Sequence, residues 1–91
     1  MKYTPYYTNK IKGQLNTLQK RGYDMNLFKE VVDMLLDGKL LPAKYNDHPL
    51  KGDKRGYRDC HIKPDWVLIY KIDKGLLTLI LSETGTHSDI L

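Results

Sequence analysis

Three histidines are the side chains of this 91-residue sequence with the most obvious capacity for chemistry. His48, His61 and His87 all lie at turns or at the ends of expected strands, and histidine can both give and take a proton near neutral pH. His61 and His87 lie near the ends of strands that flank the apolar segment 66–72, so a sheet can bring them together, with Asp65 at the same rim. The pattern predicts a proton-transfer site. The alternative is that each histidine is an ordinary surface or hydrogen-bonded loop residue.

Other kinds of site fit the sequence less well. A metal site of the three histidines and Asp65 is an alternative, but the spacings between the histidines match no short zinc-ligand pattern. A serine nucleophile is not expected, because the sequence contains no Gly-x-Ser-x-Gly motif. The single cysteine, Cys60, is expected to be a small buried residue of a strand rather than a nucleophile. We therefore expect neither a metal nor another cofactor.

Basic residues outnumber acidic ones and gather in two parts of the sequence. There are 15 Lys and Arg residues against 11 Asp and Glu residues, which gives a formal net charge of +4. Residues 1–23 contain Lys and Arg but no acidic residue, and residues 38–63 are also mainly basic. Two basic blocks in a small domain suit a polyanion such as nucleic acid, although an ordinary solvated basic surface is the alternative.

Length and composition indicate one small domain spanning residues 1–91. The apolar fraction of 41% and the charged fraction of 29% are typical of globular proteins. No apolar run approaches the roughly 18 residues that a membrane span needs, and the N-terminus lacks the apolar stretch of a signal peptide. One cysteine cannot form an internal disulfide, so the expected location is the reducing cytoplasm, with no membrane contact.

Two short amphipathic helices are expected in the first half of the chain. The first is capped within residues 8–9 and is ended by Gly22, and the second begins within residues 24–26 and is ended by Gly38. Before them, residues 2–7 are β-prone, but their proline confines them to an edge strand or a strand end. The glycine turn between the helices predicts a helical hairpin.

Strand-like alternation replaces the helical periodicity after a polar connection at residues 40–49. Strands are expected from Gly56 to residue 62, over 66–72 and over 76–82, with Gly75 supplying a positive φ in the hairpin loop. A turn at 84–86 then leads to His87 and a short tail. These elements predict an α+β fold in which two helices pack on one face of a small, mainly antiparallel four-stranded sheet.

Three motifs in the second half of the chain are specific enough to compare with known families. They read DHPLKG at 47–52, GYRDCHIKPDWVLIYK at 56–71 and TGTH at 84–87. Together they closely resemble the YafQ-type toxins of the RelE superfamily, and the resemblance extends over essentially the whole chain. It implies a RelE-like fold and a metal-independent endoribonuclease that cuts mRNA in the ribosomal A site. It also implies a cognate antitoxin that holds the enzyme inactive.

The resemblance carries the active-site residues of the family to His48, His61, Asp65 and His87. RNA cleavage without a metal needs a base for the ribose 2′-OH, an acid for the leaving 5′-oxygen and cations around the phosphate. We expect His61 and His87 to transfer the protons, Asp65 to orient or tune one of them or to share the base role, and His48 to hold the phosphate or the substrate backbone. Trp66 either stacks on a base or belongs to the core. The expected phosphate-binding cations are Lys51, Lys54, Arg55, Arg58 and Lys63.

Two residues depart from the family pattern. Relatives have an arginine where this chain has Glu83, and they often end with an aromatic residue where it has Leu91. If Glu83 points at the site, its charge opposes the phosphate and attenuates cleavage; it can also be the general base, or lie outside the site. The alternative function is accordingly an attenuated or non-catalytic toxin homologue that acts mainly through antitoxin, RNA and ribosome binding.

Overall fold

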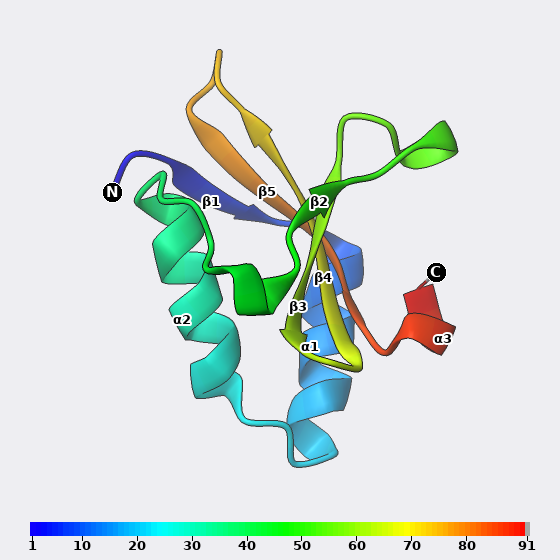
Figure 1. Ribbon diagram of the computed structural model, residues 1–91. Helices are drawn as coiled ribbons and strands as arrows, with labels where there is room; N and C mark the ends of the chain where they lie inside the picture. The colour runs from blue at the N-terminus through cyan, green and yellow to red at the C-terminus, as the bar shows by residue number, and fades with distance from the viewer. Residues whose placement is uncertain (91) are drawn as a thin grey trace.

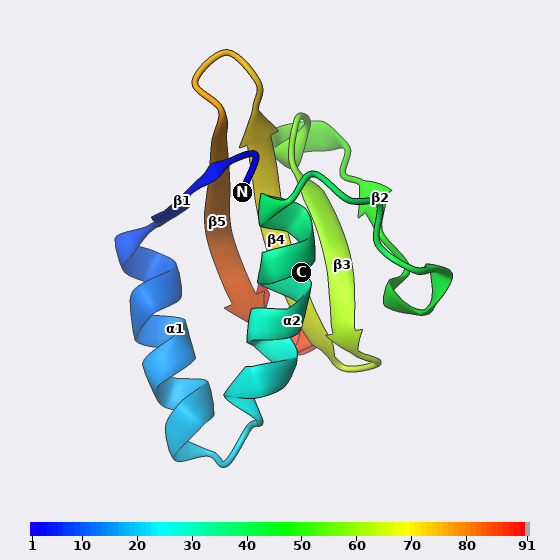
Figure 2. The ribbon, with the colours of Figure 1, turned by 90° about the vertical axis from the view of Figure 1, so that its left-hand side faces the viewer.

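Five strands and two long helices follow one another in the computed structural model, which describes residues 1–90 (Figure 1). The strands form one mixed sheet in the order β1-β5-β4-β3-β2, with β1 parallel to β5 and the other neighbours antiparallel. Figure 2 shows α2 in front of this sheet and α1 beside it, next to β5. The elements are β1 (Thr4–Tyr7), α1 (Asn9–Lys20), α2 (Met25–Leu36), β2 (His48–Pro49), β3 (Arg58–Lys63), β4 (Trp66–Asp73), β5 (Thr78–Gly85) and α3 (His87–Ile90), with 3₁₀ turns at Ala43–Tyr45 and Gly52–Lys54.

Both long helices begin where the sequence predicts, because a side chain caps each of them. Thr8 Oγ1 accepts a hydrogen bond from Ile11 N at 3.1 Å, and Asp24 Oδ1 accepts one from Asn26 N at 3.0 Å. Between the helices Gly22 adopts a φ of +86°, a left-handed conformation that favours glycine. The predicted pair of amphipathic helices joined at a glycine turn is confirmed.

The main core lies between the two long helices and the face of the sheet that they cover, which we call the inner face. It contains apolar residues of both helices and the alternating inward residues of β3, β4 and β5. A smaller apolar cluster lies on the opposite, outer face, where Leu50, Tyr57 and Ile90 pack on Val67 and Ile69. The outer face is therefore only partly covered, and its remainder is available for a site.

The sheet has five strands in the described residues, where the sequence predicts four. The additional strand is β2, which consists of His48 and Pro49 only and pairs with β3 through Asp59 and Arg58. Two residues, one of them a proline, show no period-two alternation, so the segment around them resembles a polar connection in the sequence. The fold class, with two helices on one face of a small sheet, is as predicted.

The last part of the chain is more regular than predicted. β5 continues to Gly85, although the sequence predicts its end at Ser82 and a turn directly afterwards. Residues His87–Ile90 form the short helix α3 rather than an irregular tail, because Ile90 is buried against the outer face. The expected departure at Leu91 lies outside the described residues.

The hairpin between β4 and β5 also differs from the sequence-based expectation. Its positive φ belongs to Leu77, at +49°, and not to Gly75. The loop spans residues 74–77 and is one residue longer than predicted, and Asp73 Oδ1 closes it by accepting a hydrogen bond from Leu76 N at 3.0 Å. The left-handed residue therefore stands next to β5 rather than in the middle of the loop.

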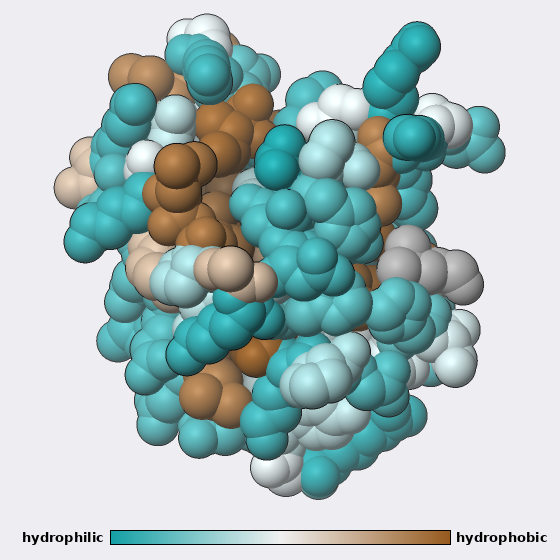
Figure 3. Space-filling view, viewed as in Figure 1, coloured by the Kyte–Doolittle hydropathy of each residue, from teal (hydrophilic) through white to brown (hydrophobic). Residues whose placement is uncertain are grey.

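The surface seen in Figure 3 is mostly hydrophilic over β2, β3 and α3. Apolar atoms gather instead toward the end of the molecule at which the N-terminus lies. Among the large apolar side chains, Leu40 is 96% exposed. Within residues 1–90, every helix is too short or too polar to cross a membrane.

Candidate active site

The three histidines come together on the outer face, at the end of the sheet where β3 turns into β4. His48 belongs to β2, His61 belongs to β3 and His87 begins α3. The ring centroids of His48 and His61 lie 6.5 Å apart, and those of His61 and His87 lie 5.1 Å apart. The register explains this proximity, because His61 is opposite Val67 and Val67 is opposite Gly85, which shortly precedes His87.

Backbone carbonyl groups fix the rings of two of these histidines. Asn46 O lies 2.9 Å from His48 Nδ1, and Pro64 O lies 3.2 Å from His61 Nδ1. A carbonyl oxygen can only accept a hydrogen bond, so each Nδ1 atom carries the hydrogen and donates it. Each ring therefore has its Nε2 atom free to exchange a proton.

Asp59 lies beside both Nε2 atoms, and the sequence analysis does not single it out. Its side chain is 2% exposed, and its Oδ1 atom is 3.2 Å from His48 Nε2 and 3.9 Å from His61 Nε2. Neither ring forms a hydrogen bond with it, and within the described residues Oδ1 is a buried oxygen without a hydrogen-bond partner. Such an atom is costly to bury, and a proton shared with a nearby imidazole would offset the cost. The sequence does indicate the position of Asp59, because the alternation of residues 57–61 puts it on the same face of the strand as His61.

Asp65 contacts His87 through the backbone. Its Oδ1 atom accepts a hydrogen bond from His87 N at 3.3 Å, and both residues are exposed. This bond joins the turn after β3 to the first residue of α3 and so helps to hold His87 beside His61. The contact agrees with an orienting role for Asp65.

Arg58 is held by a carboxylate on the inner side of β3. Its Nε atom donates to Asp47 Oδ1 at 3.1 Å, while Tyr70 OH donates to Asp47 Oδ2 at 2.7 Å. Burial lowers the pKa of Arg58, but Asp47 and Tyr70 outweigh it and the pKa is raised. Arg58 therefore anchors Asp47, the residue before His48, and its side chain is still 42% exposed, so it stays a candidate phosphate-binding cation. Of the other expected phosphate-binding cations, Lys54 is partly exposed, and the fully exposed ones are Lys51, Arg55 and Lys63.

Trp66 is a core residue and cannot stack on a base. It is 1% exposed and meets Tyr23 edge-on at a centroid distance of 5.0 Å, with Phe28 stacked at 6.5 Å. Its Nε1 atom donates to Thr84 Oγ1 at 2.9 Å, so even its polar atom has a partner. Of the two interpretations from the sequence, the structure supports the core. Cys60 is also buried as expected, and burial raises the pKa of its thiol.

Glu83 reaches the outer face because β5 contains a β-bulge at Ser82. Tyr70 of β4 pairs with Leu81, but the neighbouring Ile69 pairs with Glu83, so β5 has one extra residue at this point. The bulge reverses the alternation of the strand, whereas uninterrupted alternation would give Glu83 the direction of Leu81. Glu83 therefore faces the side of the sheet that carries the histidines.

Two lysines pair with the buried carboxylate of Glu83. The residue is 6% exposed, with Oε1 at 2.9 Å from Lys10 Nζ and Oε2 at 2.7 Å from Lys54 Nζ. Burial alone would raise the pKa of Glu83, but the hydrogen bonds from Lys54 and Lys10 outweigh burial and the pKa is lowered. A carboxylate that serves as a general base needs its pKa raised. These surroundings agree neither with Glu83 as a general base nor with Glu83 as an unscreened charge that repels the substrate phosphate.

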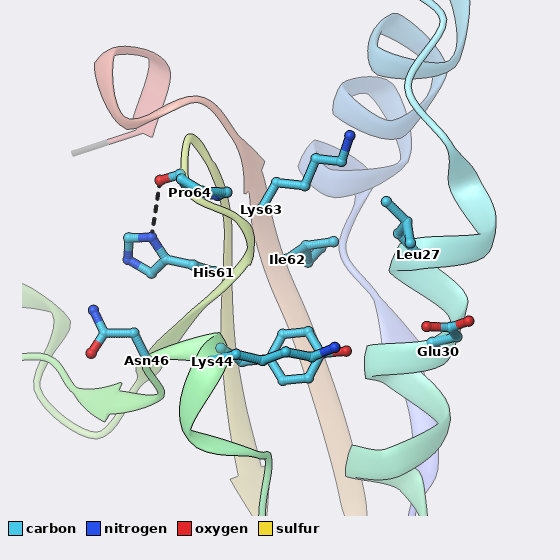
Figure 4. A pocket seen from close by; sticks show the side chains of 9 residues that line it. Leu27, Glu30, Lys44, Asn46, His61, Ile62, Lys63 and Pro64 are labelled. Carbon is cyan, nitrogen blue, oxygen red and sulfur yellow. Dashed lines mark hydrogen bonds between the residues drawn. The ribbon is translucent and has the colours of Figure 1, made fainter.

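A hollow of about 570 Å³ adjoins His61 on the side of α2 (Figure 4). Lys44 and Asn46, from the segment before β2, line it together with Lys63 at the end of β3. In Figure 4 the ring of His61 points away from α2, and its hydrogen bond to the carbonyl of Pro64 is drawn. The hollow therefore borders the histidine cluster without containing it.

Imidazole and carboxylate groups are also ligands that transition metals bind. Across residues 1–90, however, no three or more His, Cys, Asp or Glu side chains are arranged to hold a metal ion together.

Comparisons with known proteins place the chain in one family. Residues 3–91 match the family described as "Bacterial toxin of type II toxin-antitoxin system, YafQ". The mRNA interferase toxin YafQ of Escherichia coli K12 is 45% identical over 83 residues, which cover 90% of this chain and 88% of that protein. YafQ in the E. coli DinJ-YafQ complex superimposes with a TM-score of 0.90 at 38% identity, covering 98% of both chains. A metal-bound toxin from Helicobacter pylori gives 0.93 at 40% identity, covering 98% of this chain and 99% of that one.

Proposed function

Because this chain belongs to the YafQ family of type II toxin–antitoxin toxins and is an mRNA interferase, we propose that it cuts mRNA by histidine acid–base chemistry. The proposed substrate is mRNA in the ribosomal A site, as the resemblance to the RelE superfamily implies, and the proposed reaction needs no metal. One observation carries the proposal: three imidazole rings lie on one face of the sheet, with neighbouring centroids 5.1 and 6.5 Å apart.

In the proposed reaction the ribose 2′-oxygen attacks the phosphorus of the adjacent phosphodiester. One histidine takes the 2′-OH proton as the O2′–P bond forms, and another gives a proton to the 5′-oxygen as the P–O5′ bond breaks. The products are a 2′,3′-cyclic phosphate and a 5′-hydroxyl. His61 and His87 are the proposed pair, because their rings are the nearer neighbours and the backbone contact from Asp65 holds His87 in place.

His48 and Asp59 have a supporting part in this reaction. A proton on His48 Nε2 would face Asp59 Oδ1, 3.2 Å away, while His48 Nδ1 already donates to Asn46 O. From this position the ring of His48 can bind the phosphate that is being cleaved. Asp59 is a positioning residue in this proposal, and the exposed Lys51, Arg55 and Lys63 add positive charge around the substrate.

A cognate antitoxin is the proposed protein partner. The relative from E. coli forms a complex with DinJ, and the basic residues of segments 1–23 and 38–63 would attract an acidic segment of such a partner over the histidines. Electrostatic attraction acts mainly on the association rate, which should fall steeply as salt is added. A rate independent of ionic strength would contradict this part of the proposal.

The decisive experiment incubates the purified toxin with programmed ribosomes and maps the ends of the RNA. We expect a 2′,3′-cyclic phosphate, or the 3′-phosphate derived from it, and a 5′-hydroxyl, with equal yields in the presence and absence of EDTA. Loss of cleavage with the chelator and its recovery with a divalent ion would show that the reaction depends on a metal. Tight ribosome and antitoxin binding without cut RNA would favour the alternative, a non-catalytic homologue.

A further inference from the structure

A second hollow, of about 460 Å³, lies between α1 and the end of β5. β1 pairs with β5 only as far as Leu81, so beyond the bulge α1 takes the place of a neighbouring strand. Thr84 N donates to Gln14 Oε1 at 2.9 Å and connects the two elements. We call this hollow the α1–β5 groove; its lining includes Lys10, Gln14, Thr17, Arg21, Gly85 and Asp89.

The chemistry of the α1–β5 groove favours a ligand with phosphates and hydroxyl groups. α1 contributes an ammonium, an amide, a hydroxyl and a guanidinium group at positions three or four residues apart, which share one face of a helix. Such groups bind the phosphate oxygens and the 2′-hydroxyls of RNA. Protein partners instead anchor mainly on aromatic residues in well-packed pockets, and the groove offers none in its lining. The groove also reaches Gly85, close to His87, so it leads to the histidine cluster.

Glu83 pairs with two cations beside the α1–β5 groove, and one of them, Lys10, lines it. Lys10 comes from the first turn of α1 and Lys54 from the 3₁₀ turn after β2, and both ammonium groups meet the same carboxylate. The side chains of Lys10 and Lys54 are 66% and 41% exposed, whereas that of Glu83 is 8% exposed, so the carboxylate lies beneath the two cations. An ammonium has three donors, so each lysine retains donors for a further partner.

We propose that the α1–β5 groove binds the RNA backbone beside the scissile phosphate, and that Glu83 is a positioning residue that presents Lys10 and Lys54 to it. This inference rests on the proposed function. Glu83 and Asp59 lie on either side of β4, two strand spacings or about 10 Å apart. The lysines therefore contact a neighbouring phosphate rather than the one that is cleaved. Because Glu83 orders both lysines in advance, less side-chain entropy is lost when RNA binds.

Binding of a non-cleavable RNA oligonucleotide with 2′-O-methyl riboses tests the groove without any cleavage. Dissociation constants are measured over a range of KCl for the wild type, Lys10→Ala and Lys12→Ala. Lys12 is the matched control, because it is an exposed lysine of the same helix that does not line the groove. We expect Lys10→Ala to weaken binding several-fold and to reduce the salt slope by about 0.7, the value for one phosphate contact with single-stranded RNA. Lys12→Ala should remain close to the wild type.

Cleavage kinetics on programmed ribosomes test the part played by Glu83. We expect Glu83→Gln to raise KM by a larger factor than it lowers kcat, because it loosens the lysines without touching the histidines. Glu83→Asp keeps the charge and should recover part of the loss. Thermal unfolding of both variants shows whether the fold is intact, and a fall in kcat alone would overturn the positioning role.

Three further results would overturn the groove as an RNA subsite. They are equal salt slopes for Lys10→Ala and Lys12→Ala, no salt-sensitive RNA binding by the wild type, and a Lys10→Ala defect in binding poly-glutamate but not RNA. The last result would assign the groove to an acidic protein segment. Failure of the proposed function gives a different pattern: the wild type would bind the oligonucleotide with the expected salt slope and leave ribosome-bound mRNA uncut.

Discussion

Asp59 and Glu83 are buried carboxylates in the same cross-strand row of the sheet, but their surroundings differ. The row runs from His48 on β2 through Asp59 and Ile69 to Glu83 on β5. At one end Glu83 accepts hydrogen bonds or ion pairs from two lysines. At the other end Asp59 Oδ1 has no hydrogen-bond partner among the described residues and faces two imidazole rings.

The difference separates a carboxylate that orders its neighbours from one whose Oδ1 atom lacks a hydrogen-bond partner among the described residues. A buried charge with two cationic partners stabilises its own position and holds those partners in place. An unpaired buried oxygen costs stability, and proteins tolerate such a cost mainly where activity requires it. One sheet row thus combines a satisfied end, suited to binding, with an unsatisfied end, suited to chemistry.

Removing an imidazole of the proposed proton-transfer pair, at the unsatisfied end of the row, should have the largest effect. We expect His61→Ala and His87→Ala each to lower kcat by about 10²–10⁴-fold, the usual contribution of a proton-transfer group. The free energy of unfolding should change by no more than about 1 kcal/mol, because neither ring is part of the apolar core. Single-turnover cleavage and thermal unfolding measure the two quantities. Wild-type cleavage by both variants would place the chemistry elsewhere.

Neutralising the unsatisfied carboxylate should have the next largest effect. We expect Asp59→Asn to lower kcat by roughly 10–100-fold, less than the loss of a proton-transfer group, with little change in KM. Lys71→Ala, in the neighbouring strand β4, is a suitable control for an unrelated charge change.

Neutralising Glu83 should lower the stability of the fold more than neutralising Asp59, which is the reverse of their expected order of effect on kcat. We expect Glu83→Gln to lower the free energy of unfolding by about 1–2 kcal/mol, because it removes charge-assisted hydrogen bonds from two lysines. Asp59→Asn should leave it unchanged or raise it slightly, since a buried charge without a hydrogen bond is removed. Denaturant unfolding of both variants measures the difference. Equal losses would show that Asp59 is as well satisfied as Glu83.

The smallest expected effect is a dependence of stability on acid pH. The pKa of Glu83 is lowered from the ordinary value of 4.5, so its ion pairs stabilise the fold fully above that pH. The contribution is lost as the pH falls through the lowered pKa, where the folded state also binds the proton. The stability difference between the wild type and Glu83→Gln should therefore shrink as the pH falls below 4.5. A difference that persists undiminished at lower pH would point to packing rather than charge.

The sequence is a good guide to features that depend on nearby residues. The caps at Thr8 and Asp24, the glycine turn at Gly22 and the alternation of β3 can all be predicted, because each depends on residues a few positions apart. For the same reason the candidate site is anticipated as far as its histidines, since their positions at strand ends follow from the turns.

Features that depend on pairing between distant segments could not be predicted. β2 is too short to show a period, and only its pairing with β3 reveals it. The bulge at Ser82 depends on how β5 meets β4, and it decides the direction of Glu83. The lysines around Glu83 come from α1 and from the segment after β2, far from it in sequence. Asp59, by contrast, could have been predicted, because its alternation with His61 is visible in the sequence.

The parallel pairing of β1 with β5 has a consequence for the order in which the molecule is made. Thr4, among the first residues synthesised, pairs with Thr78, and Thr8 Oγ1 donates to Ser82 O at the bulge. During translation these N-terminal residues have no partner strand until the segment around β5 has emerged, and such distant contacts form late. His87 follows β5 and is later still. A nascent chain therefore lacks a complete sheet and a complete histidine cluster until nearly all the described residues are synthesised, so the proposed cleavage cannot begin before then.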